Sequence, residues 1–143
     1  MSIRQLIPYV FFNGTAEEAL RHYQQALGAK VEDLMRYKDM PPEAGTCVPE
    51  DTDRVMHATV VLGEARFMLS DVTSDRPAPA GGQVELSLEF DDPEEMARRF
   101  DALAASGEVK MAIHDAFWGD TFGALVDRFG IHWMFLCPIK KPA

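Results

Sequence analysis

Apolar and polar residues alternate along residues 83–90, and this period of two predicts a strand with one apolar and one polar face. The alternating apolar positions are Val84, Leu86, Leu88 and Phe90. Asp92, Pro93 and Glu95 follow in the pattern of a helix start, with a side-chain acceptor, a ring at the first turn and a returning carboxylate. Gly107 is predicted to end that helix.

The first third of the chain contains a second unit of the same kind. Residues 7–12 alternate as a strand, Thr15 and Glu18 predict a capped helix start, and Gly28 is predicted to end that helix. A strand-and-helix unit that occurs twice indicates an internal structural repeat. The apolar stripe of each helix is expected to face a sheet, whereas His22 is expected to face solvent.

The remaining apolar segments predict three further strands in each half, so that each half reads strand, helix, strand, strand, strand. The predicted strands cover residues 29–37, 54–62, 65–70, 109–114, 121–126 and 131–137. A segment rich in small residues, proline and glycine separates the halves. We therefore expect a first module at 1–71, a linker at 72–82 and a second module at 83–143.

Residues 39–53 form a long segment with proline, glycine and acidic residues and without hydrophobic periodicity. Loops of this length in compact domains are either binding lids or disordered segments. The composition favours a disordered or mobile flap.

Three segments resemble a known family: IPYVFFNGTAEEALRHY at 7–23, MHATVVLGEARFMLSD at 56–71 and FWGDTFGALVDRFGIHW at 117–133. Together with the repeated element order, they resemble the vicinal-oxygen-chelate superfamily of glyoxalase I, bleomycin-resistance proteins and extradiol dioxygenases. The resemblance is greatest to the PhnB-like branch and covers nearly the whole chain. It implies an α+β fold in which two βαβββ modules form open-barrel sheets around a cleft, with the helices outside.

The resemblance also locates the positions at which metal-using members hold their ion. These four positions, which those members fill with His, Glu or Gln, correspond here to Pro8, Met68, Gln83 and Met134. Proline has no donor and a thioether is a poor ligand for hard or borderline divalent ions, so only Gln83 suits such an ion. We therefore expect no metal and no other cofactor, and a nonstandard divalent metal site stays open as an alternative.

The strand alternation predicts which side chains line the cleft. Polar groups expected to face inward are His57, Gln83, Glu85 and His132, and the apolar walls are expected from Met68, Met134, Phe117 and Trp118. A carboxylate in such surroundings can act as a base, so Glu85 and His57 are the candidate catalytic residues. The alternative is a structural role for both histidines and, for Phe117 and Trp118, a plug of the barrel or a dimer contact.

Composition narrows the classes of partner. The 143 residues include 14 Lys and Arg against 23 Asp and Glu, a net charge of −9 without a basic stripe, which argues against nucleic acid. No apolar run is long enough to span a membrane and no signal peptide is apparent, so the expected location is the cytoplasm. Cys47 and Cys137 are expected to be free thiols.

Two functions therefore remain, with a structural or interaction module as a third. The first is a protein that binds a small organic molecule in its cleft without a metal. The second is a lyase, isomerase or dioxygenase that uses Glu85 and His57, with or without a nonstandard metal site. The family resemblance and the exposed strand edges also predict a homodimer.

Overall fold

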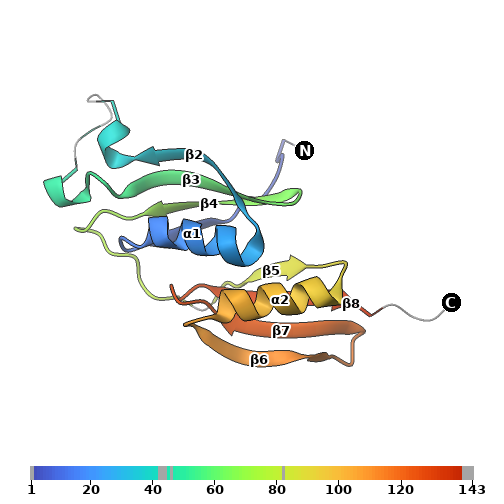
Figure 1. Cartoon of the computed structure of the whole chain (residues 1–143). Coiled ribbons are helices and arrows are strands. Elements are labelled where there is room, and N and C mark those ends of the chain that lie inside the picture. The colour runs from blue at the N-terminus through green and yellow to red at the C-terminus, as the bar shows by residue number, and fades with distance from the viewer. Residues whose placement is uncertain (1, 42–44, 46, 82, 140–143) are drawn as a thin grey trace. The chain divides into compact units, whose positions relative to one another are not determined.

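The computed structural model describes residues 2–41, 45, 47–81 and 83–139. The chain divides into two compact units, Met1–Pro79 and Ala80–Ala143, which are called unit 1 and unit 2 below (Figure 1). Each unit carries a four-stranded mixed sheet and one α-helix, so the fold is α+β with two open sheets.

Unit 1 follows the predicted order of strand, helix and three strands. Its elements are β1 (Tyr9–Phe12), α1 (Ala16–Leu27), β2 (Lys30–Arg36), β3 (Val55–Leu62) and β4 (Ala65–Asp71). The sheet has the order β1-β4-β3-β2, in which β1 runs parallel to β4 and the other neighbours are antiparallel. Strands β3 and β4 form the predicted hairpin.

Unit 2 repeats this arrangement. Its elements are β5 (Leu86–Glu89), α2 (Pro93–Ala104), β6 (Glu108–Asp115), β7 (Asp120–Val126) and β8 (His132–Pro138). The sheet order β5-β8-β7-β6 and the parallel pairing of β5 with β8 match unit 1 element for element. The predicted βαβββ repeat is therefore confirmed within each unit.

Each helix buries its apolar stripe on one face of its own sheet. In unit 1, Tyr23 of α1 meets Phe67 of β4 edge to face, with ring centroids 6.0 Å apart. In unit 2, Phe100 of α2 meets Phe135 of β8 in the same way at 5.3 Å. The expectation for His22 was wrong, because this side chain is buried on α1 beside Tyr23.

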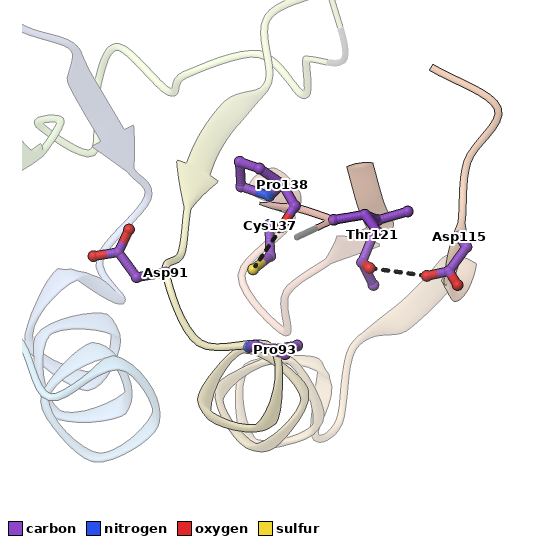
Figure 2. Close-up of a pocket in the computed structure, with 7 residues that line it drawn as sticks. Asp91, Pro93, Asp115, Thr121, Cys137 and Pro138 are labelled. Carbon is purple, nitrogen blue, oxygen red and sulfur yellow. Dashed lines mark hydrogen bonds between the residues drawn. The ribbon is translucent and has the colours of Figure 1, made fainter. Parts of the chain in front are cut away.

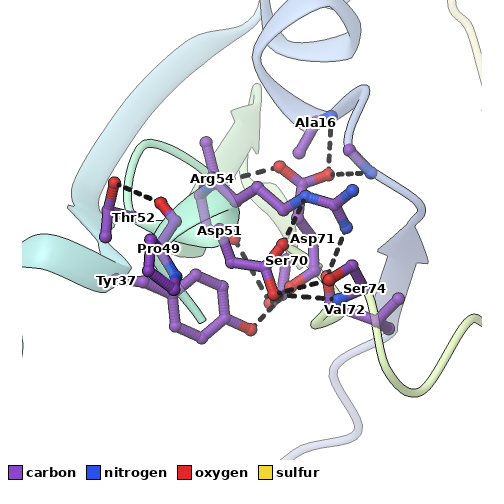
Figure 3. Close-up of polar contacts among 12 residues, drawn as sticks. Ala16, Tyr37, Pro49, Asp51, Thr52, Arg54, Ser70, Asp71, Val72 and Ser74 are labelled. Carbon is purple, nitrogen blue, oxygen red and sulfur yellow. Dashed lines mark hydrogen bonds and ion pairs between the residues drawn. The ribbon is translucent and has the colours of Figure 1, made fainter. Parts of the chain in front are cut away.

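The start of α1 is held by a residue that the sequence pattern did not indicate. Thr15 makes no side-chain cap hydrogen bond. Instead, the backbone N–H groups of Gly14 and Ala16 donate to Asp71 Oδ1 at 2.9 and 3.0 Å, and Val55 N–H donates to Oδ2 at 3.1 Å (Figure 3). Asp71, at the end of β4, thus joins α1 to both central strands.

The start of α2 follows the prediction, but its end does not. Asp92 accepts a hydrogen bond from Glu94 N–H at 3.0 Å, with Pro93 in the first turn. The helix ends at Ala104, and Ser106 rather than Gly107 takes a positive φ, of 63°. Gly107 is needed for another reason, because a Cβ there would lie 2.3 Å from the backbone oxygen of Val126.

The loop at 39–53 contains more regular structure than its composition suggested. Short 3₁₀ helices, η1 and η3, occupy Tyr37–Asp39 and Pro49–Asp51. Asp51 is fully buried and accepts hydrogen bonds from the backbone N–H and the hydroxyl of Ser74 at 3.0 and 3.1 Å. Arg54 Nε lies 3.2 Å from the same carboxylate, so this end of the loop is held in place, which differs from the flap we expected. Residues 42–44 and 46 of the loop lie outside the described residues.

Two further segments differ from the strand pattern. Strand β5 begins only at Leu86, and Val84, which was expected to face the helix, is 79% exposed. The first part of the segment at 72–82 is bound to unit 1, because Val72 N–H donates to Phe12 O at 2.8 Å and the side chain of Asn13 makes two hydrogen bonds with Ala78.

Candidate functional site

Each sheet has one face against its helix and a second face without a helix, which we call the open face. In unit 1, Phe67 faces α1, so its neighbour Met68 lies on the open face. Tyr9 and Thr59 are paired with Met68 from the two adjacent strands and share its face. The same reasoning places His57 there, opposite Met35 of β2.

The open face of unit 1 carries a hydrogen-bonded Tyr–His pair. The hydroxyl of Tyr9 lies 2.9 Å from His57 Nδ1, and His57 Nε2 lies 3.5 Å from the hydroxyl of Thr59. The Tyr9 ring is stacked on Phe11, with centroids 4.9 Å apart and planes 12° from parallel. Burial and, secondarily, the nearby Tyr37 raise the pKa of the Tyr9 phenol above its ordinary value, so the hydroxyl keeps its proton at neutral pH.

The open face of unit 2 holds four of the predicted site residues. Phe135 faces α2, so Met134 and His132 point to the opposite side. His132 Nδ1 lies 3.9 Å from Glu85 Oε1, which makes a weak ion pair when the histidine is protonated. Trp118 reaches this face through Phe122 of β7, with ring centroids 5.4 Å apart.

The aromatic turn between β6 and β7 is strongly exposed. Phe117 packs edge to face on Trp118 at 5.1 Å, yet Phe117 is 97% and Trp118 52% exposed within the chain. Large aromatic side chains at such exposure indicate a surface that contacts another molecule. Gln83 is also exposed, in the segment before β5, and no printed contact ties it to the other site residues.

The structure therefore gathers the predicted site residues in two groups. His57 and Met68 share the open face of unit 1, and Glu85, His132, Met134 and Trp118 share that of unit 2. The two groups belong to separate units, so a common cleft and a joint role for Glu85 and His57 stay predictions.

The four positions at which metal-using relatives hold an ion do not suit one in this chain. Pro8 offers only its backbone oxygen, which accepts a hydrogen bond from Met68 N–H at 2.9 Å. The Met68 and Met134 thioethers are poor ligands for hard divalent ions, which leaves Gln83 alone. Across the described residues, no three His, Cys, Asp or Glu side chains are grouped so as to hold a metal.

Unit 2 also contains a pocket of about 320 Å³ that the sequence did not indicate (Figure 2). Its lining comes from the start of α2 and from the adjoining ends of three strands: Asp91, Pro93, Asp115, Thr121, Cys137, Pro138 and Ile139. Thr121 donates to Asp115 at 2.9 Å, and the Asp91 carboxylate points away from the Cys137 thiol. The wall is mainly apolar and includes none of the predicted site residues.

Tyr9 and Phe11 are the functional candidates that the sequence interpretation missed. Their signal was present, because they alternate with Val10 and the buried Phe12 along β1. A half-exposed aromatic pair on such a strand, at 39% and 51% exposure, indicates a face that contacts something other than the core. No α-helix in the described part of the chain is long and apolar enough to cross a membrane.

Comparison with known proteins gives matches over nearly the full length. The family model described as the Glyoxalase/Bleomycin resistance protein/Dioxygenase superfamily matches residues 5–135. Protein YjdN of Escherichia coli K12 is 33% identical, covering 96% of this chain and 97% of its own. The crystal structure of protein PA1353 from Pseudomonas aeruginosa is 35% identical with a TM-score of 0.86, covering 96% and 100%. A PhnB protein from Bacillus cereus is 25% identical with a TM-score of 0.71, covering 94% and 99%.

Proposed function

The chain belongs to the glyoxalase/bleomycin resistance protein/dioxygenase superfamily, and from this premise we propose that it binds a small organic molecule with an aromatic part, without the metal of its metal-using relatives. The family hosts both enzymes and binding proteins, so the proposal must rest on the chain's own side chains. The observation that carries it is the open face of unit 1.

That face combines apolar area with a few polar groups, which is the usual chemistry of a small-molecule site. Tyr9, Phe11 and Met35 are each at least 39% exposed, and the Tyr9–His57 pair lies among them. Covering this apolar area with a ligand would release about 25 cal/mol per Å² removed from water. The polar pair would then orient the ligand rather than supply most of its affinity.

Unit 2 supports the same proposal with its aromatic turn. Phe117 and Trp118 offer ring faces and edges to an aromatic ligand, and Glu85 and His132 lie on the same sheet. Stacking or edge-to-face contacts of this kind contribute about 0.5–1.5 kcal/mol beyond burial. The net charge of −9 favours a neutral or cationic ligand over a nucleic acid.

An enzyme is the second candidate, favoured by one observation. The Glu85–His132 contact at 3.9 Å joins a carboxylate and an imidazole on an open face, a pair able to move a proton. In that case, Glu85 would act as the base, with His57 as the second proposed catalytic group. A lyase or isomerase reaction needs no group beyond these, whereas a dioxygenase would need a nonstandard metal site.

We also propose that the protein is a cytoplasmic homodimer. The support is the exposure of Phe117 and Trp118, together with the free edges of β2 and β6. Light scattering of the purified protein at micromolar concentration should give twice the chain mass of 16.0 kDa. A monomer would contradict the proposal.

The test of ligand binding uses thermal shift and isothermal titration with small aromatic compounds. A compound that binds the folded state raises the unfolding temperature in proportion to its saturation. We expect Phe11→Ala or Trp118→Ala to weaken binding by about 5- to 10-fold, and Leu6→Ala, which removes an exposed apolar side chain outside the strands, to leave it unchanged. No stabilisation by any aromatic compound would contradict the proposal.

Metal analysis separates the two candidates. Protein purified without chelators should contain no stoichiometric Ni, Zn, Mn or Fe. One equivalent of any of these would contradict the metal-free proposal and favour the enzyme.

A further inference from the structure

The Tyr9–His57 contact determines what kind of ligand atom the open face of unit 1 recognises. We propose that Tyr9 holds His57 in the neutral tautomer with its proton on Nε2, so that this face offers an N–H donor to an oxygen acceptor on an aromatic ligand. This inference rests on the proposed ligand-binding function and names the ligand chemistry. Tyr9 is thus a positioning residue that acts through His57.

The direction of the hydrogen bond follows from the chemistry of its two partners. A neutral imidazole has one N–H donor and one lone pair, and the partner of each nitrogen selects which is which. Tyr9 remains a phenol at neutral pH because partial burial raises its pKa. A phenol O–H is a strong donor and an imidazole lone pair a strong acceptor, so at 2.9 Å the proton lies on Tyr9 and Nδ1 accepts it.

The position of Tyr9 is fixed by two independent contacts. Strand β1 is paired with β4, which places Tyr9 opposite Met68 and lets its ring reach over β4 to His57 on β3. Phe11 stacks on the same ring at 4.9 Å. Because the phenol is held on both sides, Nδ1 of His57 keeps its partner and the ring keeps its orientation.

The other nitrogen is left with unused donor capacity. The distance from Nε2 to the Thr59 hydroxyl is 3.5 Å, at the limit for a hydrogen bond. A ligand carbonyl or ether oxygen at about 2.9 Å would be a better acceptor. In this tautomer, His57 has no free lone pair with which to remove a proton, so it serves as a donor and not as the general base of the enzymatic alternative.

The experiment compares wild type with Tyr9→Phe, which keeps the ring and removes the hydroxyl. Tyr37→Phe is the matched control, because its hydroxyl donates to the backbone oxygen of Asp71 and does not touch His57. Long-range ¹H–¹⁵N correlation spectra report the His57 tautomer directly. The binding probes are coumarin, a planar bicycle with a carbonyl acceptor, and naphthalene, which has no acceptor.

We expect wild type and Tyr37→Phe to have the Nε2–H form and Tyr9→Phe to have a mixture of tautomers. Coumarin should bind Tyr9→Phe more weakly by a factor of about 3 to 10, the effect of one hydrogen bond, whereas naphthalene should bind all three proteins alike. Backbone amide spectra establish that each variant is folded.

Three results would overturn the inference, and they differ from one another. An Nδ1–H tautomer in wild type contradicts the role of Tyr9 whatever binds. Equal coumarin affinity for wild type and Tyr9→Phe rejects the donor while the binding function survives. Failure of both probes to bind removes the proposed function and the donor role together.

Discussion

The two units have the same strand order and helix position, but the starts of their helices are held by different means. The first N–H groups of α1 are satisfied by Asp71, which lies about fifty residues further along the chain. Those of α2 are satisfied by Asp92, the residue just before the helix. Equal topology therefore does not imply equal wiring, since the same orphan donors can be paired locally or across the fold.

The difference extends through the polar groups buried in each unit. In unit 1, Asp51 joins η3 to Ser74 and Arg54, and the guanidinium of Arg54 lies within 3.1 Å of where a Cβ on Gly14 would stand. In unit 2, buried Asp127 binds only within its own hairpin, accepting hydrogen bonds from Phe129, Ile131 and Trp133. Unit 1 thus depends on long-range polar contacts, and unit 2 on local ones.

The largest expected effect comes from Asp71→Asn. The amide can still accept two of the three backbone hydrogen bonds, but its NH₂ group would face a third donor, Val55 N–H, in a buried site. We expect a loss of about 3 kcal/mol in the free energy of unfolding, because buried donors are left unpaired. Chemical denaturation measures it. Asp91→Asn, at an exposed position, is the control, and an equal loss for both variants would contradict the assigned role of Asp71.

Gly107→Ala should have the next largest effect and sharpens the comparison of the helix ends. Its Cβ would lie 2.3 Å from the Val126 backbone oxygen, so the two segments must separate, at a cost of about 2–3 kcal/mol. In unit 1, Gly28 ends α1 with a φ of 69°. Gly28→Ala strains the backbone by about 1 kcal/mol. If the unfolding free energies show Gly28→Ala to be the more damaging change, the assignment of the two glycines is reversed.

The elements of the fold could be predicted because they depend on local patterns. Alternation gave the strands, and the Asp92-Pro93 start and Gly28 end followed from backbone chemistry within a few residues. The Asp71 cap could not be predicted, because its partners are brought close only when β1 pairs with β4. The exposure of Val84 is of the same kind, since an apolar residue in a strand pattern is buried only where a neighbour covers it.

The candidate site was predicted in part for the same reason. Alternation assigns a side chain to a face, and it correctly grouped Glu85 with His132 and His57 with Met68. It does not give partners across strands, so the contact of Tyr9 with His57 was missed although both residues alternate as predicted. Reading the site from His, Glu and metal positions alone also passed over a tyrosine that the family comparison does not single out.

Asp92→Ala tests the local cap and should cost less than the change at Asp71. It removes one hydrogen bond, from Glu94 N–H at an exposed helix start, where water can replace the lost acceptor. The expected loss is about 1 kcal/mol of unfolding free energy. Thr15→Ala is the matched change at the start of α1, and it should cost less than half as much because Thr15 makes no side-chain cap hydrogen bond. A larger loss for Thr15→Ala would mean that the helix start depends on Thr15 after all.

The smallest effect concerns the surface ion pairs, which follow the same division. In unit 1, Arg36 of β2 binds Glu17 of α1 at 2.8 Å, whereas Arg99 and Glu95 of unit 2 lie one turn apart on α2 at 3.6 Å. The hydrogen bond from Arg36 lowers the pKa of Glu17 below its ordinary value of 4.5. A lowered carboxyl pKa stabilises the fold above the unfolded-state value, and that contribution is lost as the pH falls through the folded-state pKa.

We therefore expect Glu17→Gln to lower the unfolding free energy by about 0.5 kcal/mol near neutral pH, the usual contribution of an exposed pair. The difference from wild type should narrow as the pH falls below 4.5 and also shrink at high salt, because screening weakens exposed pairs. Glu18→Gln, one residue further along α1, is the control and should show neither dependence. Denaturation curves over a pH series measure both. A difference that persists unchanged in acid would mean that Glu17 stabilises unit 1 through packing of its methylene groups and not through its charge.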